Sequence, residues 1–402
     1  MVNNHYAVIG GGINGLSVAR QLLLDFPDSR VTVFEKEQKV AQHQSSHNSG
    51  VVHAGLYYEP GGLKARLCRR GAELVKQYCL EKDIAYDECG KVVVALNTVE
   101  EIRLESIYQR SIANKVADVR MLNAEEISAV EPNCIGTKAL YSPRTAIVSY
   151  GDIAQKIAEE ILEKGADIIL GRAVTHLTEN NKKISVHFSD NDHHDSTFDY
   201  VVSCAGLQSD RLAAHSGDIK TPKIVPFFGQ YYVIDEAYKE HVKGLIYPVP
   251  DPSYPFLGVH FTKRIDGQMT IGPNAFISLG RENYSGTDYN VVDIYDFLTY
   301  RGFWRFSSKN VPAAARELRT VLSQTNFVAQ AAKYVPSLAN VSVTPATRGI
   351  RAQAMETDGS LVDDFVIRKQ GNITHIRNAP SPGATSSLAI AEYIVKEIMT
   401  HE

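Results

Sequence analysis

Hydrophobic and polar residues near the start of the chain follow a pattern that predicts two strands joined by a helix. The apolar run Tyr6–Ile9 ends in three glycines, and apolar residues then recur at helical spacing from Ile13 to Phe26. Val31–Phe34 is a second run of β-branched and aromatic residues, which is typical of a strand. Strand, tight turn, helix and strand in this order predict a right-handed βαβ unit.

Later segments predict further elements of a mixed fold. A helix is expected over Asp152–Lys164, with Asp152 as the N-cap and Gly165 as the stop. Alternation over Ile184–Phe188 predicts a half-buried strand, and the apolar run Tyr200–Cys204 predicts a buried strand of a parallel sheet. The chain has no repeat and no long linker, so we expect interleaved domains.

Composition narrows the class of protein. The 402 residues suffice for two or three domains, and 44% hydrophobic with 22% charged residues is ordinary for a globular protein. The net charge of −4 gives no electrostatic footprint for nucleic acid. Because the first predicted strand begins at Tyr6, we expect no signal or transit peptide, and no apolar run is long enough to predict a spanning helix.

The cysteines are odd in number and form no CxxC pair, which excludes a zinc ribbon and a dense disulfide framework. We therefore expect no metal site, and we expect reduced thiols in a cytoplasmic compartment, acting as small buried hydrophobes. The five are Cys68, Cys79, Cys89, Cys134 and Cys204.

Three glycines in the first turn form the pattern GxGxxG: Gly10, Gly12 and Gly15. The first glycine makes the turn, the second lets the backbone approach a pyrophosphate, and the third lets helix and strand pack closely. The helix then offers free N–H groups to the phosphates. Glu35 follows the second strand and can accept both ribose hydroxyls, so the pattern predicts an adenine dinucleotide without a 2′-phosphate.

The segment after the second strand favours FAD over NAD. Residues 45–58 are polar, punctuated by glycine and rich in hydrogen-bond donors, where an NAD enzyme would continue with another βαβ unit. We expect this loop to hold the rest of an extended FAD and to present its ring to a substrate.

Several long and unusual segments follow one another along nearly the whole chain: HNSGVVHAGLYYEPGGLKARLC (47–68), CAGLQSDR (204–211), YPVPDPSYPFLGVHFTKRIDG (247–267), RGIRAQ (348–353), LVDDF (361–365) and NAPSPGATSSLAI (378–390). In this order they resemble the L-2-hydroxyglutarate dehydrogenase/oxidase family, within the D-amino-acid-oxidase-like superfamily of FAD enzymes. The resemblance implies an α/β fold, with a discontinuous Rossmann-like FAD domain (1–85, 146–222 and 345–402). It also implies an interleaved α+β substrate domain built on an antiparallel sheet (86–145 and 223–344), with a helical part at 290–335.

The resemblance also implies which residues bind FAD. They are Gly10, Gly12, Gly15, Glu35, Lys36, Ser45, Ser46, His47, Asn48, Ser49, Gly50, Val174, Ala205, Gly206, Gly383, Ala384, Thr385 and Ser386. Residues 45–50 would lie along the pyrophosphate and the ring edge, and Val174 would touch the adenine side through its backbone. FAD is expected to be non-covalent, although His47 stands where some relatives in the superfamily attach it covalently.

The loop 383–386 would open the last helix, Ser387–Thr400, against the flavin. The positive end of that helix dipole would then face negative charge on the reduced ring. An ordinary Ser/Thr N-cap explains the same residues.

Oxidation of a 2-hydroxy acid needs hydride transfer from C2 to flavin N5, a base for the hydroxyl proton and cations for the carboxylates. His53 and His260 are the candidate bases, because imidazole titrates near the working pH. A histidine in an apolar strand, here Phe256–Phe261, is alternatively structural. Arg351 resembles the arginine that clamps the substrate carboxylate elsewhere in the superfamily. Further substrate candidates are Tyr57, Tyr58, Lys263 and Arg348.

One position departs from the family pattern. The resemblance predicts an arginine, a glycine and an acid after Val225–Phe227, but the chain has Phe228, Gly229 and Gln230. If that arginine belongs to the pocket, the distal carboxylate of 2-hydroxyglutarate lacks a partner here. The substrate would then be another hydroxy acid or a less charged relative.

Aromatic and basic residues alternate between Phe297 and Arg319. The aromatic residues are Tyr300, Phe303, Trp304 and Phe306, and the basic ones are Arg301, Arg305, Lys309, Arg316 and Arg319, with Glu317 as the one acid. Such a surface suits an anionic membrane, and membrane contact suits a dehydrogenase that reduces quinone. A helical subdomain with a core of aromatic residues is the alternative.

These observations together predict FAD-dependent oxidation of a 2-hydroxy acid, namely L-2-hydroxyglutarate to 2-oxoglutarate. Electrons would pass to quinone or oxygen, in a cytoplasmic protein that lies peripherally on the inner face of the membrane. One alternative is an oxidase of a different hydroxy acid, an amine or an amino acid. Another is a flavin-binding sensor or interaction protein without catalytic activity.

Overall fold

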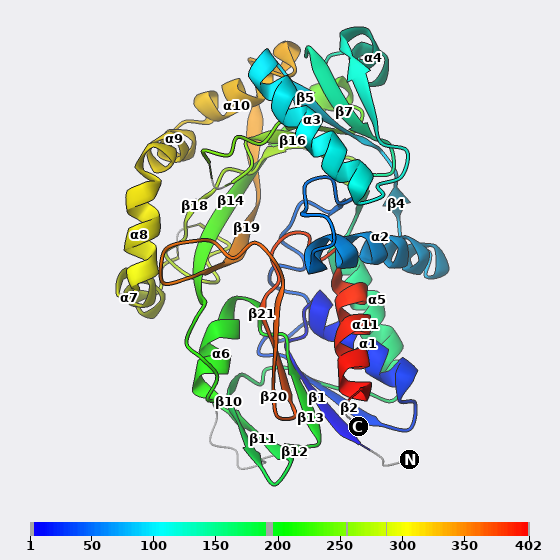
Figure 1. Ribbon diagram of the computed structural model, residues 1–402, viewed down its shortest axis with the longest axis vertical. Helices are drawn as coiled ribbons and strands as arrows, with labels where there is room; N and C mark the ends of the chain where they lie inside the picture. Colours follow the sequence, from blue (N-terminus) through cyan, green and yellow to red (C-terminus); the bar gives the residue numbers. More distant parts are fainter. Residues whose placement is uncertain (1–3, 190–195, 255, 287, 401–402) are drawn as a thin grey trace.

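The predicted βαβ unit forms the centre of a six-stranded sheet, in the lower half of Figure 1. The computed structural model describes residues 4–189, 196–254, 256–286 and 288–400. The sheet has the order β20–β21–β13–β1–β2–β9, with bounds Val366–Gln370, Ile373–Asn378, Tyr200–Ser203, His5–Ile9, Arg30–Phe34 and Asp167–Ile169. Strand β1 pairs in parallel with β2 and β13, so the predicted parallel arrangement is confirmed.

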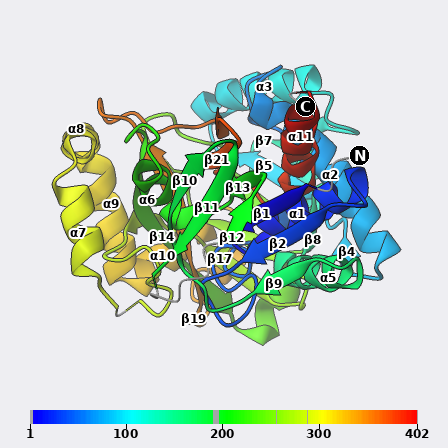
Figure 2. The ribbon, with the colours of Figure 1, turned by 90° about the horizontal axis from the view of Figure 1, so that it is seen from below.

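Alternate residues of β1 face two different cores, as a strand buried on both sides requires. Tyr6 and Val8 face a core shared by four helices, which are α1 Ile13–Asp25, α2 Leu63–Glu81, α5 Tyr150–Glu163 and α11 Ser387–Met399. Ala7 and Ile9 face the other core, shared with a small antiparallel sheet and helix α6, whose bounds are β10 Val174–Asn180, β11 Lys183–Phe188, β12 Ser196–Phe198 and α6 Ser209–His215. Figure 2 shows the six-stranded sheet between these layers.

Helix α5 is capped by a different residue from the one predicted. The side chain of Ser149 accepts a hydrogen bond from the backbone N–H of Asp152, at 3.3 Å. Ser149 is therefore the N-cap, and the prediction of Asp152 was wrong. Asp152 lies in the first turn instead, where a carboxylate interacts favourably with the helix dipole.

A nine-stranded, mainly antiparallel sheet forms the upper half of the molecule (Figure 1). It follows the path β18–β14–β17–β16–β15–β5–β7–β6, with β19 beside β14. Its strands, in that order, are Phe276–Ile277, Lys223–Ile234, Met269–Gly272, His260–Lys263, Leu245–Pro248, Lys91–Ala95, Lys138–Ser142, Arg120–Asn123 and, for β19, Val343–Met355. Helices α3 (Thr98–Ala113) and α4 (Ala124–Val130) pack against it.

Two expectations about this sheet need correction. The apolar run at 256–261 is not one strand, because β16 begins only at His260. Phe256 and Leu257 line a cavity, and each also packs against side chains of the nine-stranded sheet without belonging to a strand. The predicted domain boundary at residue 345 cuts through β19, which pairs with β14 along most of its length. Residues 345–355 therefore belong to the substrate-side sheet.

A third sheet of three short strands connects the two halves. It has the order β3–β8–β4, with bounds Val51–Val52, Ala146–Val148 and Tyr86–Asp87. The side chain of Val52 packs in the core around α1, whereas that of Val51 packs in the core of the nine-stranded sheet. Strand β3, which directly follows residues 45–50, is thereby fixed between the two halves. Short 3-10 helices complete the fold, at Gly206–Gln208, Glu236–His241 and Pro336–Leu338.

The segment predicted to be helical contains four helices at the side of the molecule (Figures 1 and 2): α7 Val291–Leu298, α8 Arg301–Lys309, α9 Val311–Leu322 and α10 Gln324–Ala332. Tyr300 and Phe306 are buried, and Phe303 packs against the same core, so the alternative of an aromatic core holds for these three. Trp304 is 57% exposed. The side chains of Arg316 and Arg319 lie outside the described residues.

Within the described part of the chain, no helix is both long and apolar enough to cross a membrane. All five cysteines are free thiols, as expected. Burial raises the pKa of each thiol to about 12, so these cysteines act as small apolar side chains.

Candidate active site

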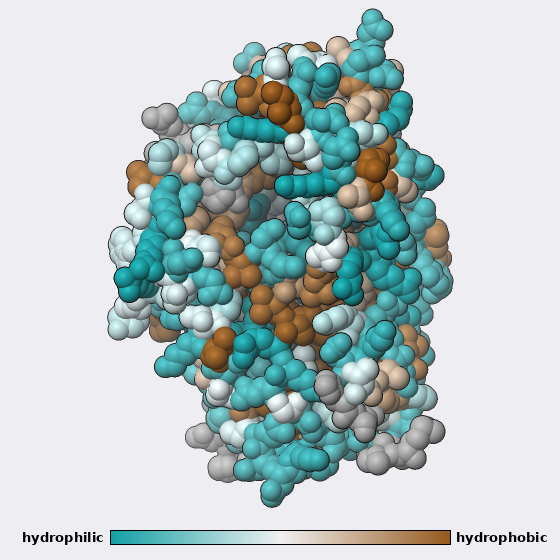
Figure 3. Space-filling model, in the orientation of Figure 1, coloured by the Kyte–Doolittle hydropathy of each residue, from teal (hydrophilic) through white to brown (hydrophobic). Residues whose placement is uncertain are grey.

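A cavity of about 960 Å³ lies between the six-stranded and the nine-stranded sheets. Its wall includes Ile9 and Phe34, which end β1 and β2, together with residues of β14 and β19. Ligands of open α/β sheets bind at this carboxyl edge of the strands. Apolar side chains gather in the middle of the face shown in Figure 3, and hydrophilic side chains cover most of the rest.

The glycine turn brings the backbone of β1 and α1 to one end of this cavity. Gly10 has a φ of +106°, and a Cβ atom there would lie 2.5 Å from the carbonyl oxygen of Cys204. A Cβ atom at Gly15 would overlap the carbonyl group of Gly10. Gly10 and Gly12 line the cavity, whereas Gly15 lies beneath the turn, where helix and strand pack closely.

The carboxylate of Glu35 lies at the same end and is almost buried. It accepts hydrogen bonds from the backbone N–H of Gly11 at 2.7 Å and from that of Glu37 at 2.9 Å. Each of its oxygens keeps a second lone pair for a ribose hydroxyl. The Ser45 hydroxyl oxygen accepts from the N–H of Ile13 at 2.9 Å, so its own O–H can donate into the cavity.

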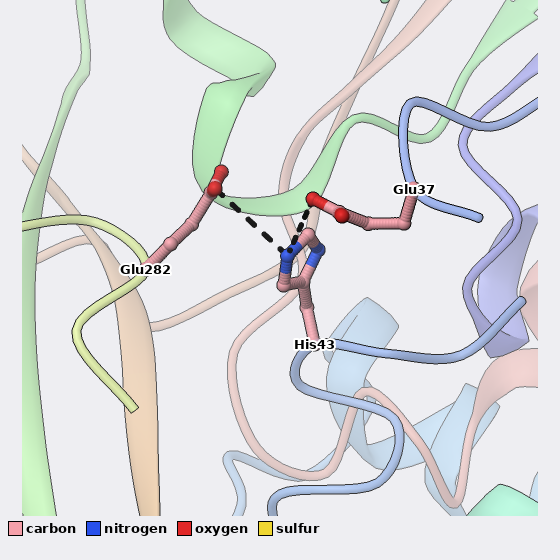
Figure 4. Close-up of side chains that lie close together, drawn as sticks. All are labelled: Glu37, His43 and Glu282. Carbon is pink, nitrogen blue, oxygen red and sulfur yellow. Dashed lines mark ion pairs between the residues drawn. The ribbon is translucent and has the colours of Figure 1, made fainter. Parts of the chain in front are cut away.

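Lys36 lies at this end of the cavity beside a cluster formed by Glu37, His43 and Glu282. Figure 4 shows the carboxylates of Glu37 and Glu282 turned toward the ring of His43, whose Nε2 atom lies 3.3 and 3.9 Å from them. The three side chains are close enough to share a metal ion. The ammonium of Lys36, however, lies 2.6 Å from Glu37 and 2.8 Å from Glu282, so it already supplies the positive charge that these carboxylates need.

Most of the other predicted cofactor residues also line the cavity: His47, Asn48, Ser49, Val174, Ala205, Gly206, Gly383, Ala384 and Thr385. Three predicted residues do not. Ser46 donates a hydrogen bond to the carbonyl of Ala41, and Gly50 has a positive φ and packs against Val148. Ser386 lies buried at the start of α11. These three shape the wall from behind.

The loop before α11 is tied to the cofactor loop. The hydroxyl of Thr385 lies 2.7 Å from that of Tyr150 and accepts from the backbone N–H of His53 at 3.2 Å. No side chain of the described residues caps α11, so a simple Ser/Thr N-cap does not account for this loop. The N–H groups at the start of α11 instead lie next to the wall of the cavity.

The two candidate bases line the other end of the cavity. The Nδ1 atom of His260 lies 2.8 Å from the carbonyl oxygen of Gly258. A carbonyl only accepts, so Nδ1 carries the proton, and Nε2 of the neutral ring keeps its lone pair. Burial, with nearby Lys91, lowers the pKa of His260 to about 3, and it does the same for His53. Both imidazoles are therefore neutral proton acceptors at ordinary pH.

Arg351 reaches this end from β19, with its guanidinium 5.0 Å from the ring of Phe256. No carboxylate within the described ranges forms an ion pair with it. Burial lowers its pKa, and Tyr231, the carboxylate of Glu317 and Tyr247 partly oppose that shift. A partly buried cation that forms no ion pair with a carboxylate is suited to bind an anionic ligand.

The other substrate candidates lie outside the cavity wall. Lys263 is paired with Asp87 at 2.8 Å, and the guanidinium of Arg348 lies 4.1 Å from the ring of Phe228. The ring of Tyr57 faces the ammonium of Lys91, and the ring of Tyr58 faces the ammonium of Lys64. Phe228 faces a core with Leu207, Ile224, Ile350 and Ala354, so the exchange at this position removes no charge from the cavity wall.

Sequence reasoning missed several polar residues near the two histidines. Tyr231 and Tyr247 line the cavity, and so does Lys64, whose ammonium lies 2.8 Å from Asp363. Lys91 lies behind Tyr247. One sequence signal was available for Lys91, because it is the only charged residue of the apolar run Lys91–Ala95.

The comparisons with known proteins agree with this geometry. The model of the DAO family, described as FAD dependent oxidoreductase, matches residues 5–397. The chain belongs to this family. It also belongs, within it, to the family of L-2-hydroxyglutarate dehydrogenases, so the predicted resemblance is confirmed. A relative of that name from Nematostella vectensis is 42% identical, over 98% of this chain and 90% of its own. One from Escherichia coli (strain K12) is 37% identical, over 98% and 93%.

Solved structures of DAO-family proteins share the fold. An L-alpha-glycerophosphate oxidase from Mycoplasma pneumoniae with FAD bound has a TM-score of 0.76 at 23% identity, over 98% of this chain and 94% of its own. A glycine oxidase from Geobacillus kaustophilus has a TM-score of 0.70 at 17% identity, over 98% and 94%. The predicted α/β fold with interleaved antiparallel strands is confirmed.

The protein is therefore an FAD-dependent oxidoreductase, and the alternative of a sensor without catalytic activity is set aside. The residues present fit the cofactor. A glycine turn without Cβ atoms faces the cavity at the start of α1, and a buried carboxylate with unused lone pairs ends β2. The volume of the cavity is also at the upper end of the range for ligand sites.

We expect Glu35→Gln to weaken FAD binding about tenfold or more, because an amide loses charge-assisted hydrogen bonds with two backbone N–H groups. The measurement is the dissociation constant of FAD, from its fluorescence on titration into apoprotein. Glu159→Gln, on the exposed side of α5, is the matched control. Unchanged FAD affinity in Glu35→Gln would contradict the assignment.

Proposed function

We propose that the protein oxidises L-2-hydroxyglutarate to 2-oxoglutarate. The observation that carries the proposal is the partly buried guanidinium of Arg351, which forms no ion pair within the described residues, beside two neutral imidazoles in the cavity that fits FAD. This combination suits a substrate with a carboxylate and a hydroxyl group on adjacent carbons. The names of the relatives support the same substrate.

Each residue has a distinct task in this proposal. The guanidinium of Arg351 binds the C1 carboxylate in a bidentate manner. His260 accepts the hydroxyl proton at Nε2, because its Nδ1 proton is held by the Gly258 carbonyl. His53, fixed to Thr385 through its backbone, orients the hydroxyl from the cofactor side. When bound, FAD supplies the acceptor for the hydride that leaves C2.

The test is anaerobic reduction of the yellow holoprotein. We expect L-2-hydroxyglutarate to bleach the flavin absorbance at about 450 nm, a band set by the cofactor itself. The D enantiomer is the control, because the carboxylate and hydroxyl sites allow only one hand to direct its C2–H toward the ring. Bleaching by amino acids or amines in place of the hydroxy acid would favour the alternative of an amine or amino-acid oxidase.

Replacement of either histidine is expected to slow this bleaching about 100-fold or more, with FAD retained, because the hydroxyl proton loses its acceptor or its orientation. His260→Ala and His53→Ala are compared with His215→Ala at the exposed end of α6, by stopped-flow absorbance. Burial lowers both pKa values to about 3, so the wild-type rate at saturating substrate should stay level from pH 8 to pH 6. A fall near the ordinary imidazole pKa of about 6.5 would contradict a neutral base.

We further propose that quinone in an anionic membrane accepts the electrons, with oxygen as the alternative acceptor. Support comes from a surface that we call the α7–α8 patch. It consists of five exposed apolar or aromatic side chains and one exposed basic side chain, namely Val291, Val292, Tyr295, Leu298, Trp304 and Arg301. The indole N–H of Trp304 donates a hydrogen bond to the carbonyl of Leu298 at 2.7 Å. Exposed aromatic and basic residues together suit a lipid headgroup region.

Vesicles containing phosphatidylglycerol should sediment the wild-type protein in moderate salt. Neutral phosphatidylcholine vesicles should sediment it less, because they lack the anionic charge that attracts Arg301. The double change Tyr295→Ser and Trp304→Ser is expected to abolish sedimentation. Leu80→Ser on α2, where an equally exposed apolar side chain is lost, is the control. Equal sedimentation of the double variant and the wild type would exclude the patch as the membrane contact.

A further inference from the structure

Lys91 is a buried cation that has no task in the reaction described above. It begins β5 and is only 2% exposed. Its ammonium lies 3.9 Å from the ring centre of Tyr247 and 4.7 Å from that of Tyr57. No carboxylate within the described ranges pairs with it. Burial of an ammonium without an acid is costly, and aromatic faces recover only part of that cost.

The strand register places Lys91 in a row with two residues of the cavity wall. Strand β15 lies between β5 and β16. Leu245 of β15 is opposite Lys91, so Tyr247, two residues further on, points to the same face of the sheet. On the other side of β15, the ring of His260 stacks on Tyr247 with 3.8 Å between centroids. Tyr247 therefore stands between the ammonium of Lys91 and the imidazole of His260.

This row connects Lys91 with the substrate end of the cavity. Tyr247 and His260 line the cavity, whereas Lys91 does not. One aromatic ring therefore separates its charge from the cavity. In a region of low dielectric constant, a charge at that depth still acts on an anion in the cavity.

The lysines that line the cavity wall are less suited to attract an anion. Lys36 is paired with Glu37 and Glu282, and Lys64 is paired with Asp363. Lys309 is exposed to water, and its ammonium donates a hydrogen bond to the backbone carbonyl of Asp358 at 3.4 Å. Arg351 is not paired with a carboxylate within the described ranges, and it would be occupied by one carboxylate of the substrate. A substrate with a second carboxylate would then meet the field of Lys91.

We propose that Lys91 is a positioning residue that makes the site prefer dicarboxylates to monocarboxylates, by holding a buried positive charge behind Tyr247. This inference rests on the proposed function in one respect, which is that the ligand is a dicarboxylate. It also gives the second carboxylate a cation without any arginine at position 228.

Titration of the groups around Lys91 supports this role. Burial lowers its pKa to about 7, so its charge is present below that pH and is lost above it. The groups that face it are Tyr57, Tyr247 and Cys68, whose pKa values burial raises, to about 12 for Cys68. His53 and His260 have pKa values near 3. Of these groups, only Lys91 changes charge between about pH 6.5 and 8.5.

The experiment compares two unreactive ligands of the same chain length, glutarate and pentanoate, on the oxidised holoprotein. Their dissociation constants are measured by calorimetry and by the change in the flavin spectrum. We expect Lys91→Met, which keeps the length and removes the charge, to weaken glutarate binding about tenfold while pentanoate changes less than about twofold. Lys138→Met, on β7 of the same sheet and paired with Glu101, is the matched control.

A loss of affinity that is equal for both ligands, or absent for both, would overturn the inference, because a packing role affects the two alike. Lys91→Arg provides a second test that does not depend on the folding of Lys91→Met. In the wild type, glutarate binding should weaken from pH 6.5 to 8.5 more than pentanoate binding does. Arginine stays charged over this range, so Lys91→Arg should remove that difference.

These assays do not depend on turnover, so they separate the two proposals. If the flavin is not reduced by L-2-hydroxyglutarate but glutarate binding still depends on Lys91, the proposed function fails and the role of Lys91 stands. If the flavin is reduced but the preference for glutarate is unchanged in Lys91→Met, the role of Lys91 fails and the proposed function stands.

Discussion

The architecture depends on how closely the backbone can approach itself at the first turn. The carbonyl of Gly10 lies where a Cβ atom of Gly15 would be, and Gly10 in turn lies against the carbonyl of Cys204 at the end of β13. This contact fixes three things together: the angle of α1 on the sheet, the spacing of β1 and β13, and the direction of the N-terminal N–H groups of α1. The cavity begins where this turn ends.

A second constraint is the burial of positively charged side chains at the other end of the cavity, near the two histidines. Lys36 and Lys64 of the wall are paired with carboxylates, whereas within the described residues Arg351 and the buried Lys91 behind Tyr247 form no such pair. Burial is the main reason why both imidazoles stay neutral, and the nearby positive charge of Lys91 adds to this effect. Positive charge without a partner also attracts an anion. In the proposed reaction this positive charge binds the substrate, at a cost in stability that the large cores of the protein can offset.

The two halves of the molecule contribute different parts of the site. The six-stranded sheet supplies backbone groups and a carboxylate for the cofactor, and the nine-stranded sheet supplies His260, Tyr247 and Arg351. The short strand β3 places one valine in each core and so sets the position of His53 directly after it. The side chains of His53, His260 and Arg351 therefore line the same cavity as the predicted cofactor residues only because the chain crosses between the two halves.

The sequence by itself determined the βαβ unit, the glycine turn, the end of β2 at Glu35 and the family, because these rest on local spacing and on residue types that neighbouring positions constrain. It also predicted His53, His260 and Arg351, which the fold brings to one cavity from segments up to hundreds of residues apart. It did not predict where β16 starts, that β19 belongs to the nine-stranded sheet, that Phe228 lies outside the cavity wall or that Lys91 is buried against Tyr247. Tertiary structure alone decided these, because strand register and the burial of a charge depend on partners distant along the chain.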